Sequence, residues 1–326
     1  MDREEIFKKI ENERGSRLIT YITGDRKPFT TQIGDDVVPI INRHLENIGI
    51  QKKISLFLFT RGGDMLAPLR IVKLIKSHTS KFEVIIPLFA QSAGTMIAIG
   101  ANTIIMGKLG ELSPVDPKTG HPFNPRNPDN PKQVLEVSVE DLNSYFMLAK
   151  EMAGVKEEQK LDVFKMLVDK IHPLSLGNIY RAFRMSKILT ERLLCLHMDR
   201  DKDKDKIKKI TNALTGDICI HGYPITRDEA LDLGLNIEKS GIELEKLIYE
   251  LYNSYAEIMK LGIPFNPTEL LSPGKESEDI SYSGAYIESI GLSDQFIFKG
   301  KVIKSIRDNK STIDININSQ KWEKVK

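Results

Sequence analysis

The feature that most constrains the fold is a pair of apolar segments, each followed by a turn of small residues. Residues 54–59 read Ile-Ser-Leu-Phe-Leu-Phe and run into Thr-Arg-Gly-Gly-Asp at 60–64. Residues 84–89 run into Ala-Gln-Ser-Ala-Gly-Thr at 90–95. Near-continuous apolar runs of this length are typical of strands buried on both faces of a sheet. Two strand-to-helix units in succession predict an α/β fold with a mainly parallel sheet and crossover helices.

The same alternation extends over the first third of the chain. Val38, Ile41 and Leu45 recur at helical spacing, for example, and indicate an amphipathic helix. We expect helices over 2–14, 35–48, 65–77 and 92–101, and strands over 17–23, 54–59, 83–89 and 103–106.

Residues 117–133 interrupt this pattern because prolines recur there, at 117, 122, 125, 128 and 131. Proline removes a backbone donor and breaks both helices and central strands, so we predict a long irregular loop. Such a loop is either a lid or channel wall, or a plain surface excursion. Helices are expected to resume over 139–153, 157–171 and 174–198.

The C-terminal part is less regular. Residues 199–209 alternate acids and bases, which favours a solvated helix face or linker over a nucleic-acid patch. An amphipathic helix is expected over 242–260. Residues 263–285 are rich in Pro, Ser and Gly, and no element is assigned there. Strand signals follow at 295–306 and 312–317, on either side of the turn-prone Asp308-Asn309.

Composition excludes several classes of function. The net charge of +2 gives no argument for nucleic-acid binding, and 40% hydrophobic residues suffice for a sizeable core. Two cysteines do not make a disulfide scaffold, which fits a reducing compartment, and we expect the cytoplasm. The charged N-terminus lacks a signal-peptide core. Residues 82–107 are apolar but interrupted by polar residues and Pro87, so no membrane span is expected.

No cofactor or metal is expected from the motifs. Two Cys/His pairs, Cys195 with His197 and Cys219 with His221, resemble a set of metal ligands, but their spacing is not that of ordinary zinc sites. A phosphate-binding loop of the Gly-x-x-x-x-Gly-Lys type is missing from the sequence, so the chain on its own is expected to be ATP-independent.

The two turns have the residue types of an acyl-transfer site. Ser92 has small neighbours, as a nucleophilic hydroxyl needs for substrate to approach. Glycine has no Cβ, so Gly62 and Gly63 let bare backbone come close to a ligand and hold a developing oxyanion. The alternative for Ser92 is a helix N-cap, which serine also favours after a strand.

The ordered set of these motifs resembles the serine dehydrogenase proteinase family. It comprises Gly62-Gly63, Ser-Ala-Gly-Thr at 92–95, Leu-Ser-Pro-Val-Asp-Pro at 112–117 and Tyr-Pro-Ile-Thr-Arg-Asp-Glu-Ala at 223–230. That family is a branch of the Clp protease/crotonase superfamily, related to signal peptide peptidase A. The resemblance covers roughly residues 5–240. It implies a Clp/crotonase-like core with a C-terminal helix and small β-rich tail, and oxyanion-hole N–H groups from Gly63 and Ala93.

The resemblance also implies an organisation and partners. We expect a serine protease domain over 1–240 and an extension over 241–326 for oligomerisation or for docking of a regulatory protein. The expected assembly is a homo-oligomer that encloses Ser92, and the expected substrate is a peptide or unfolded protein.

The general base is where the sequence departs from its relatives. Clp-type proteases place a histidine about 25 residues after the serine, and Asp116 stands there instead. His221 stands in the segment where they place the triad aspartate. We therefore hypothesise an exchanged triad in which Ser92 attacks, His221 is the base and Asp116 orients the imidazole. Lys150, as the base of a Ser–Lys dyad, and His172 are alternatives, and Lys132 is a further nearby lysine.

Two other functions remain open from the sequence. One is a crotonase-type acyl-CoA enzyme, in which the same oxyanion donors stabilise an enolate. The other is a catalytically inactive Clp-like scaffold, because no lysine or histidine after Ser92 lies in register with the relatives.

Overall fold

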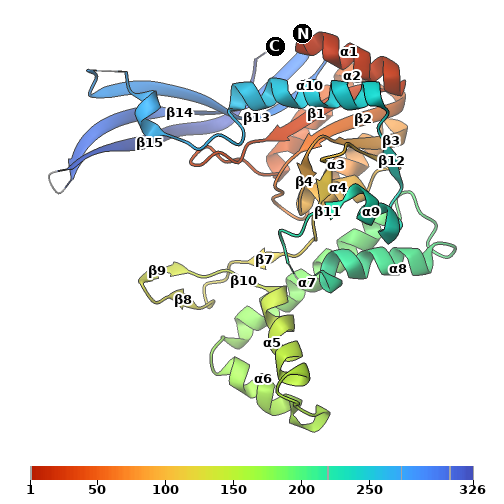
Figure 1. Ribbon diagram of the computed structural model, residues 1–326, viewed down its shortest axis with the longest axis vertical. Coiled ribbons are helices and arrows are strands. Elements are labelled where there is room, and N and C mark those ends of the chain that lie inside the picture. Colours follow the sequence, from red (N-terminus) through yellow and green to blue (C-terminus); the bar gives the residue numbers. More distant parts are fainter. Residues whose placement is uncertain (1, 219, 273, 308–309, 326) are drawn as a thin grey trace.

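A computed structural model describes residues 2–218, 220–272, 274–307 and 310–325. Within these residues an eight-stranded sheet has the order β12-β5-β3-β2-β1-β13-β14-β15 (Figure 1). The five strands from β12 to β1 run parallel, which confirms the predicted α/β fold with a mainly parallel sheet. Their bounds are β1 Arg17–Thr23, β2 Gln51–Phe59, β3 Thr79–Ile86, β5 Thr103–Met106 and β12 Ile237–Lys239.

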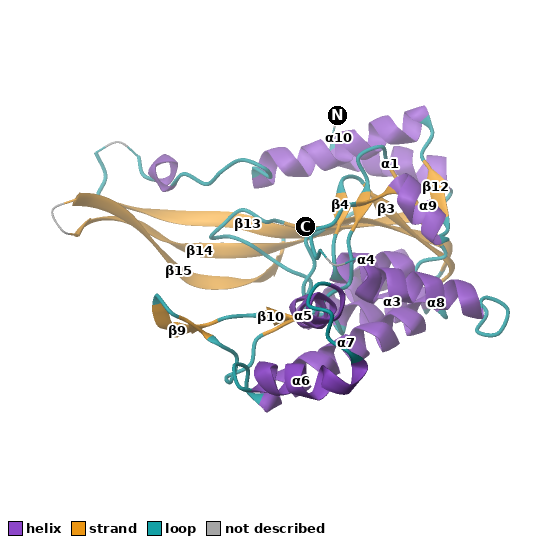
Figure 2. Ribbon diagram, turned by 60° about the horizontal axis from the view of Figure 1, so that its bottom comes forward, coloured by secondary structure: helices purple, strands orange, loops and turns teal. Residues whose placement is uncertain are grey.

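Helices cover both faces of the parallel part (Figure 2). The side chains of β2 point alternately to the two faces of the sheet. Phe57 and Phe59 pack against the helices on one face, while Leu56 and Leu58 belong to the core on the other face. This alternation explains why the strand reads as a continuous apolar run. The first face carries α1 Arg3–Arg14 and α10 Ile242–Met259; the second carries α2 Val38–Ile48, α3 Ala67–Lys76, α4 Ala93–Ile99, α7 Pro173–Leu194 and α8 Lys204–Asn212.

The C-terminal strands continue the same sheet instead of forming a separate small tail. β13 pairs antiparallel with β1, with Tyr21 opposite Ile287. Beyond the helices, the three strands extend as a long arm (Figure 1). Their bounds are β13 Ser277–Ser289, β14 Leu292–Arg307 and β15 Lys310–Lys324. No element is predicted over 263–285, but this range contains the short helical turn Pro267–Leu270 and the first part of β13. The predicted turn at Asp308-Asn309 lies outside the described residues.

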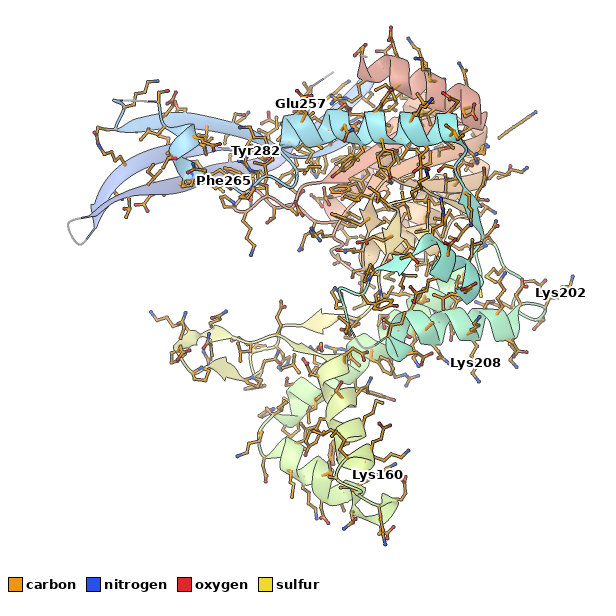
Figure 3. The ribbon with its side chains drawn as sticks, viewed as in Figure 1. Lys160, Lys202, Lys208, Glu257, Phe265 and Tyr282 are labelled. Carbon is orange, nitrogen blue, oxygen red and sulfur yellow. The ribbon has the colours of Figure 1, made fainter. Side chains whose placement is uncertain are left out.

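The proline-rich stretch is not wholly irregular. It forms two antiparallel two-stranded sheets, one of β7 Lys118–Thr119 with β10 Val137–Ser138 and, between them in the chain, a hairpin of β8 Arg126–Asn127 with β9 Asn130–Val134. Pro131 is tolerated in β9 because each strand of a two-stranded hairpin has a free edge, where no backbone donor is required. Helices α5 Val139–Glu151 and α6 Lys160–Val168 then project from the body, and the labelled Lys160 lies on this projection (Figure 3).

A second, small sheet supports the Ser92 turn. Its order is β11-β6-β4, with β4 Phe89–Ala90, β6 Glu111–Leu112 and β11 Ile225–Thr226, and β11 leads into α9 Arg227–Leu233. Short helical turns occur at Asp35–Val37, Glu157–Gln159, Ala213–Asp217 and Pro267–Leu270. Among the described helices, none has the length and apolarity required to cross a bilayer.

Candidate active site

Ser92 lies at the turn between β4 and α4 in an unusual backbone conformation. Its φ and ψ are 51° and −111°, and a positive φ is strained for a residue with a side chain. Although Ser92 holds the N-cap position of α4, its side chain makes no capping hydrogen bond. The half-buried hydroxyl is therefore not used in the role that the N-cap alternative gives it.

The paired glycines approach this turn at a distance that no side chain would permit. A Cβ added to Gly62 would lie 2.9 Å from the Ser92 Cβ, and one added to Gly63 would lie 2.2 Å from the Ile33 carbonyl oxygen. Gly63 forms an isolated parallel bridge with Ile33, in which the Ile33 N–H donates to the Gly62 carbonyl. Gly62 is thus required for the close contact between the two turns, and Gly63 for the close contact with Ile33.

Two backbone donors are available beside Ser92. Ala93 begins α4, so its N–H has no partner within the helix. The Ile33 bridge uses the Gly62 carbonyl and the Asp64 N–H. Within the described residues, neither the Gly63 nor the Ala93 N–H donates a hydrogen bond to the protein. Free, fixed N–H groups are what an oxyanion hole needs, and the Ala93 N–H also lies at the positive end of α4.

The structure brings Ser92, Gly63, Asp116 and His221 to one cleft of about 660 Å³. The His221 Nδ1 is 4.0 Å from the Asp116 Oδ2, with the Asp116 side chain 3% exposed and the His221 side chain 34% exposed. A buried carboxylate beside a half-exposed imidazole is the environment in which aspartate stabilises a histidine cation. Pro117 and Gly120 also line the cleft, so the start of the proline-rich stretch forms part of its wall.

The alternative bases lie elsewhere. Of the described residues that line the Ser92 cleft, none is Lys132, Lys150 or His172. Lys150 is exposed on α5, and Lys132 is exposed on β9. His172 accepts a hydrogen bond from the Leu174 N–H at the start of α7, which gives it a structural role as a helix cap.

Two buried hydroxyls next to Ser92 were missed by the sequence reasoning. Ser113 accepts the Ser92 N–H at 2.8 Å, and Thr95 accepts the Ser113 N–H at 3.0 Å. Both residues lie inside motifs singled out above, but a sequence does not show which hydroxyl in a motif points to the backbone.

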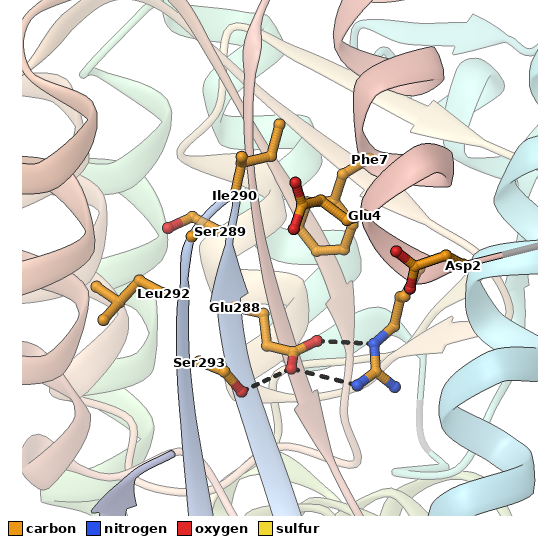
Figure 4. Close-up of a pocket in the computed structure, with 10 residues that line it drawn as sticks. Asp2, Glu4, Phe7, Glu288, Ser289, Ile290, Leu292 and Ser293 are labelled. Atoms are coloured by element: carbon orange, nitrogen blue, oxygen red, sulfur yellow. Dashed lines mark hydrogen bonds and ion pairs between the residues drawn. The ribbon is translucent and has the colours of Figure 1, made fainter. Parts of the chain in front are cut away.

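A second cavity, of about 160 Å³, lies between α1 and the β13–β14 turn and contains none of these groups (Figure 4). There Glu288 accepts hydrogen bonds from Arg3, from Ser293 and from the Tyr255 hydroxyl. Burial raises the pKa of Tyr255 well above its ordinary value, so the phenol stays a neutral donor. This set of contacts ties α1 and α10 to the sheet.

The residues that the structure describes contain no cluster of His, Cys, Asp or Glu side chains suited to hold a metal. Cys219, one member of the Cys/His set considered above, lies outside the described residues.

The chain is similar in sequence to proteins whose activity is not characterized. Two uncharacterized proteins of Methanocaldococcus jannaschii are similar: MJ0137 is 28% identical over 260 residues, covering 77% of this chain and 78% of its own length. MJ1495 is 28% identical over 268 residues, covering 79% and 78%.

Among solved structures, a 1510-N membrane-bound stomatin-specific protease in complex with a substrate peptide is 15% identical, with a TM-score of 0.39 over 65% of this chain and 73% of that one. ClpP1 from Listeria monocytogenes is 14% identical, with a TM-score of 0.36 over 73% and 97%.

The family comparison concerns the part of the chain that carries both turns. The model of the ClpP-like SDH-type serine proteinases matches residues 1–129, which include Gly62, Gly63, Ser92 and Asp116. This match confirms the resemblance drawn from the motifs and indicates a ClpP-like serine protease. Residues 1–129 are therefore similar to the ClpP-like SDH-type serine proteinases.

Proposed function

We propose that this protein is a serine peptidase that hydrolyses peptide bonds through an acyl-enzyme on Ser92, with His221 as general base and Asp116 as the group that orients it. One observation carries the proposal. The strained, uncapped Ser92 shares a cleft with His221 and Asp116, residues that come together from distant parts of the sequence. A nucleophile, a base and a buried carboxylate in one cleft are the parts that acyl transfer requires.

The chemistry follows from these roles. The Ser92 Oγ attacks the peptide carbonyl carbon while the His221 Nε2 takes its proton, and the carbonyl oxygen becomes an oxyanion. The Gly63 and Ala93 N–H groups donate to that oxyanion. The C–N bond then breaks as His221 returns the proton to the leaving amine, which leaves an ester on Ser92. Water, deprotonated by His221, attacks the ester; the bond to the Ser92 Oγ then breaks as His221 returns the proton to that oxygen, which releases the acid and the Ser92 hydroxyl.

Asp116 stabilises the imidazolium formed in each step. Its Oδ2 is 4.0 Å from the His221 Nδ1, which is beyond a hydrogen bond. Catalytic hydrogen bonds are often long without substrate and shorten in the complex. His221 lies in the turn before β11, outside helices and strands, so a shift of about 1 Å there disturbs no helix or strand.

A fluorophosphonate probe tests the proposal, because it phosphonylates an activated serine. We expect an adduct on Ser92, located by mass spectrometry, that is lost in Ser92→Ala. His221→Ala and Asp116→Asn should lower the rate of peptide hydrolysis by about 10²–10⁴-fold. His172→Ala is the matched control, because its imidazole caps a helix away from the cleft.

The outcomes separate the competing functions. Undiminished reaction in His221→Ala would refute the assigned base, and Lys150→Ala would then be tested in the same assay. A wild-type protein that forms no adduct but binds an acyl-CoA tightly would point to a crotonase-type enzyme. One that does neither would be a scaffold.

We further propose that the protein works as a homo-oligomer, with residues 241–326 as an assembly or partner-docking region built into the same sheet. Exposed apolar side chains on and beside the projecting helices α5 and α6 support the homo-oligomer, because monomeric proteins rarely leave so much apolar surface uncovered. They are Met147, Leu148, Met152, Leu161, Phe164 and Met166. Light scattering of the full chain tests it, and a strictly monomeric mass would refute it.

A further inference from the structure

A fully buried serine holds the backbone of the Ser92 turn. The Ser113 Oγ accepts the Ser92 N–H at 2.8 Å and donates to the Pro114 carbonyl oxygen at 3.1 Å. Its side chain is 0% exposed. The hydroxyl proton is therefore committed to a carbonyl, and the lone pair of the oxygen faces the Ser92 amide. This bond fixes the orientation of the peptide group that precedes the nucleophile.

A second buried hydroxyl fixes Ser113 in turn. Thr95, also 0% exposed, accepts the Ser113 N–H at 3.0 Å. Its own hydroxyl lies 2.9 Å from both the Ala90 and the Ser113 carbonyl oxygens. Thr95 lies in the first turn of α4, Ala90 ends β4, and Ser113 follows β6. Two side chains thus join the three segments that meet at the Ser92 turn.

We propose that Ser113 and Thr95 are positioning residues that hold Ser92 in its reactive conformation. This inference rests on the proposed function of Ser92 as nucleophile. A residue with a side chain keeps a φ of 51° only where its surroundings over-determine it. The hydrogen bond to Ser113 supplies that constraint. It also turns the Ser92 N–H away from the role of an oxyanion donor, which leaves that role to Gly63 and Ala93.

The pair does not form a second nucleophile. Each hydroxyl proton faces a backbone carbonyl, and neither side chain is accessible to solvent. The two residues act through Ser92, so their loss should slow the bond-forming step without weakening the initial binding of a reagent.

The experiment measures how fast the fluorophosphonate probe reacts with Ser92 as a function of probe concentration. The variants are Ser113→Ala, Thr95→Val, which keeps the shape but loses the hydroxyl, and Thr95→Ser, which keeps the hydroxyl. Urea unfolding of each variant ensures that rates are compared in folded protein. If Ser113→Ala does not fold, the comparison of Thr95→Val with Thr95→Ser tests the proposal.

We expect the limiting rate to fall about 10- to 100-fold in Ser113→Ala and Thr95→Val, with the half-saturating probe concentration unchanged. Thr95→Ser should react within about threefold of wild type, a rescue that general loss of packing would not give. Equal limiting rates in wild type, Ser113→Ala and Thr95→Val would overturn this inference alone. A wild-type protein that forms no adduct would overturn the proposed function, and the inference with it.

Discussion

A buried histidine that does not line the Ser92 cleft should make the stability of this protein depend on pH. His44, on α2, is 0% exposed. Its Nδ1 is 2.8 Å from the Ser289 Oγ, and its Nε2 is 3.1 Å from the Asp294 Oδ2. Asp294 also pairs with Arg43. Burial lowers the pKa of His44 from 6.5 to about 4, and the attraction of Asp294 offsets only part of that effect.

The sign follows from proton binding in the two states. Between pH 6.5 and pH 4 the unfolded chain binds a proton at His44 that the folded protein does not bind. The contribution of neutral His44 to the free energy of unfolding is therefore complete above pH 6.5 and is lost as the pH falls towards 4. Each pH unit in this window costs roughly 1.4 kcal/mol, so about 3 kcal/mol is lost between pH 7 and pH 4.

Urea unfolding of wild type and His44→Gln at several pH values measures this contribution. The variant cannot titrate at this position, so it isolates His44 from other groups such as His197, whose pKa burial also lowers. We expect the difference in unfolding free energy between the two proteins to shrink by about 3 kcal/mol from pH 7 to pH 4. Parallel pH profiles would show that His44 does not carry the effect.

Two further substitutions test the packing described above. Gly63→Ala places a Cβ 2.2 Å from the backbone oxygen of Ile33. It should lower the free energy of unfolding by about 3 kcal/mol and abolish the reaction of Ser92 with the probe. Gly177→Ala, in α7 where a Cβ meets nothing within 4 Å, should instead be neutral or stabilise by up to about 1 kcal/mol, and equal losses in both would refute the reasoning. Glu288→Ala should lower the free energy of unfolding, measured in urea, by about 3 kcal/mol, because it leaves the largely buried Arg3 and the Tyr255 hydroxyl without their partner. Its control, Glu157→Ala, breaks an exposed ion pair and should change stability by less than about 1 kcal/mol; a Glu288 effect that small would contradict the role given to the cluster.

The sequence predicts an element reliably only where the element's residues form a clear hydrophobic pattern. The apolar runs over 54–59 and 84–89 predict β2 and the end of β3, because a short near-continuous apolar run between turns is typical of a strand buried on both faces. The expected strand over 83–89 is in fact interrupted after Ile86, and Phe89 begins the separate strand β4. By contrast, β13 was missed because its first half, Ser277–Ser283, is polar and extends beyond the helices. A strand that is held by its neighbours more than by a core has little signal of its own.

The site divides in the same way. Register against related proteins was enough to choose His221 and Asp116, and the structure places both at the cleft of Ser92. The hydroxyls of Ser113 and Thr95 were not predicted, because their importance lies in which backbone groups they face. That depends on the packing of β4, β6 and α4 against one another, and no local pattern encodes it.

The pairing of β1 with β13 has a consequence for how the chain is synthesised. β1 leaves the ribosome early, whereas its antiparallel neighbour is among the last strands made. At roughly 5–20 residues per second, the interval between them is on the order of tens of seconds. Throughout that time one side of β1 presents unpaired N–H and C=O groups, the template for association with another nascent chain. A ribosome stalled after residue 240 would therefore hold a chain in which this edge of β1 stays unpaired.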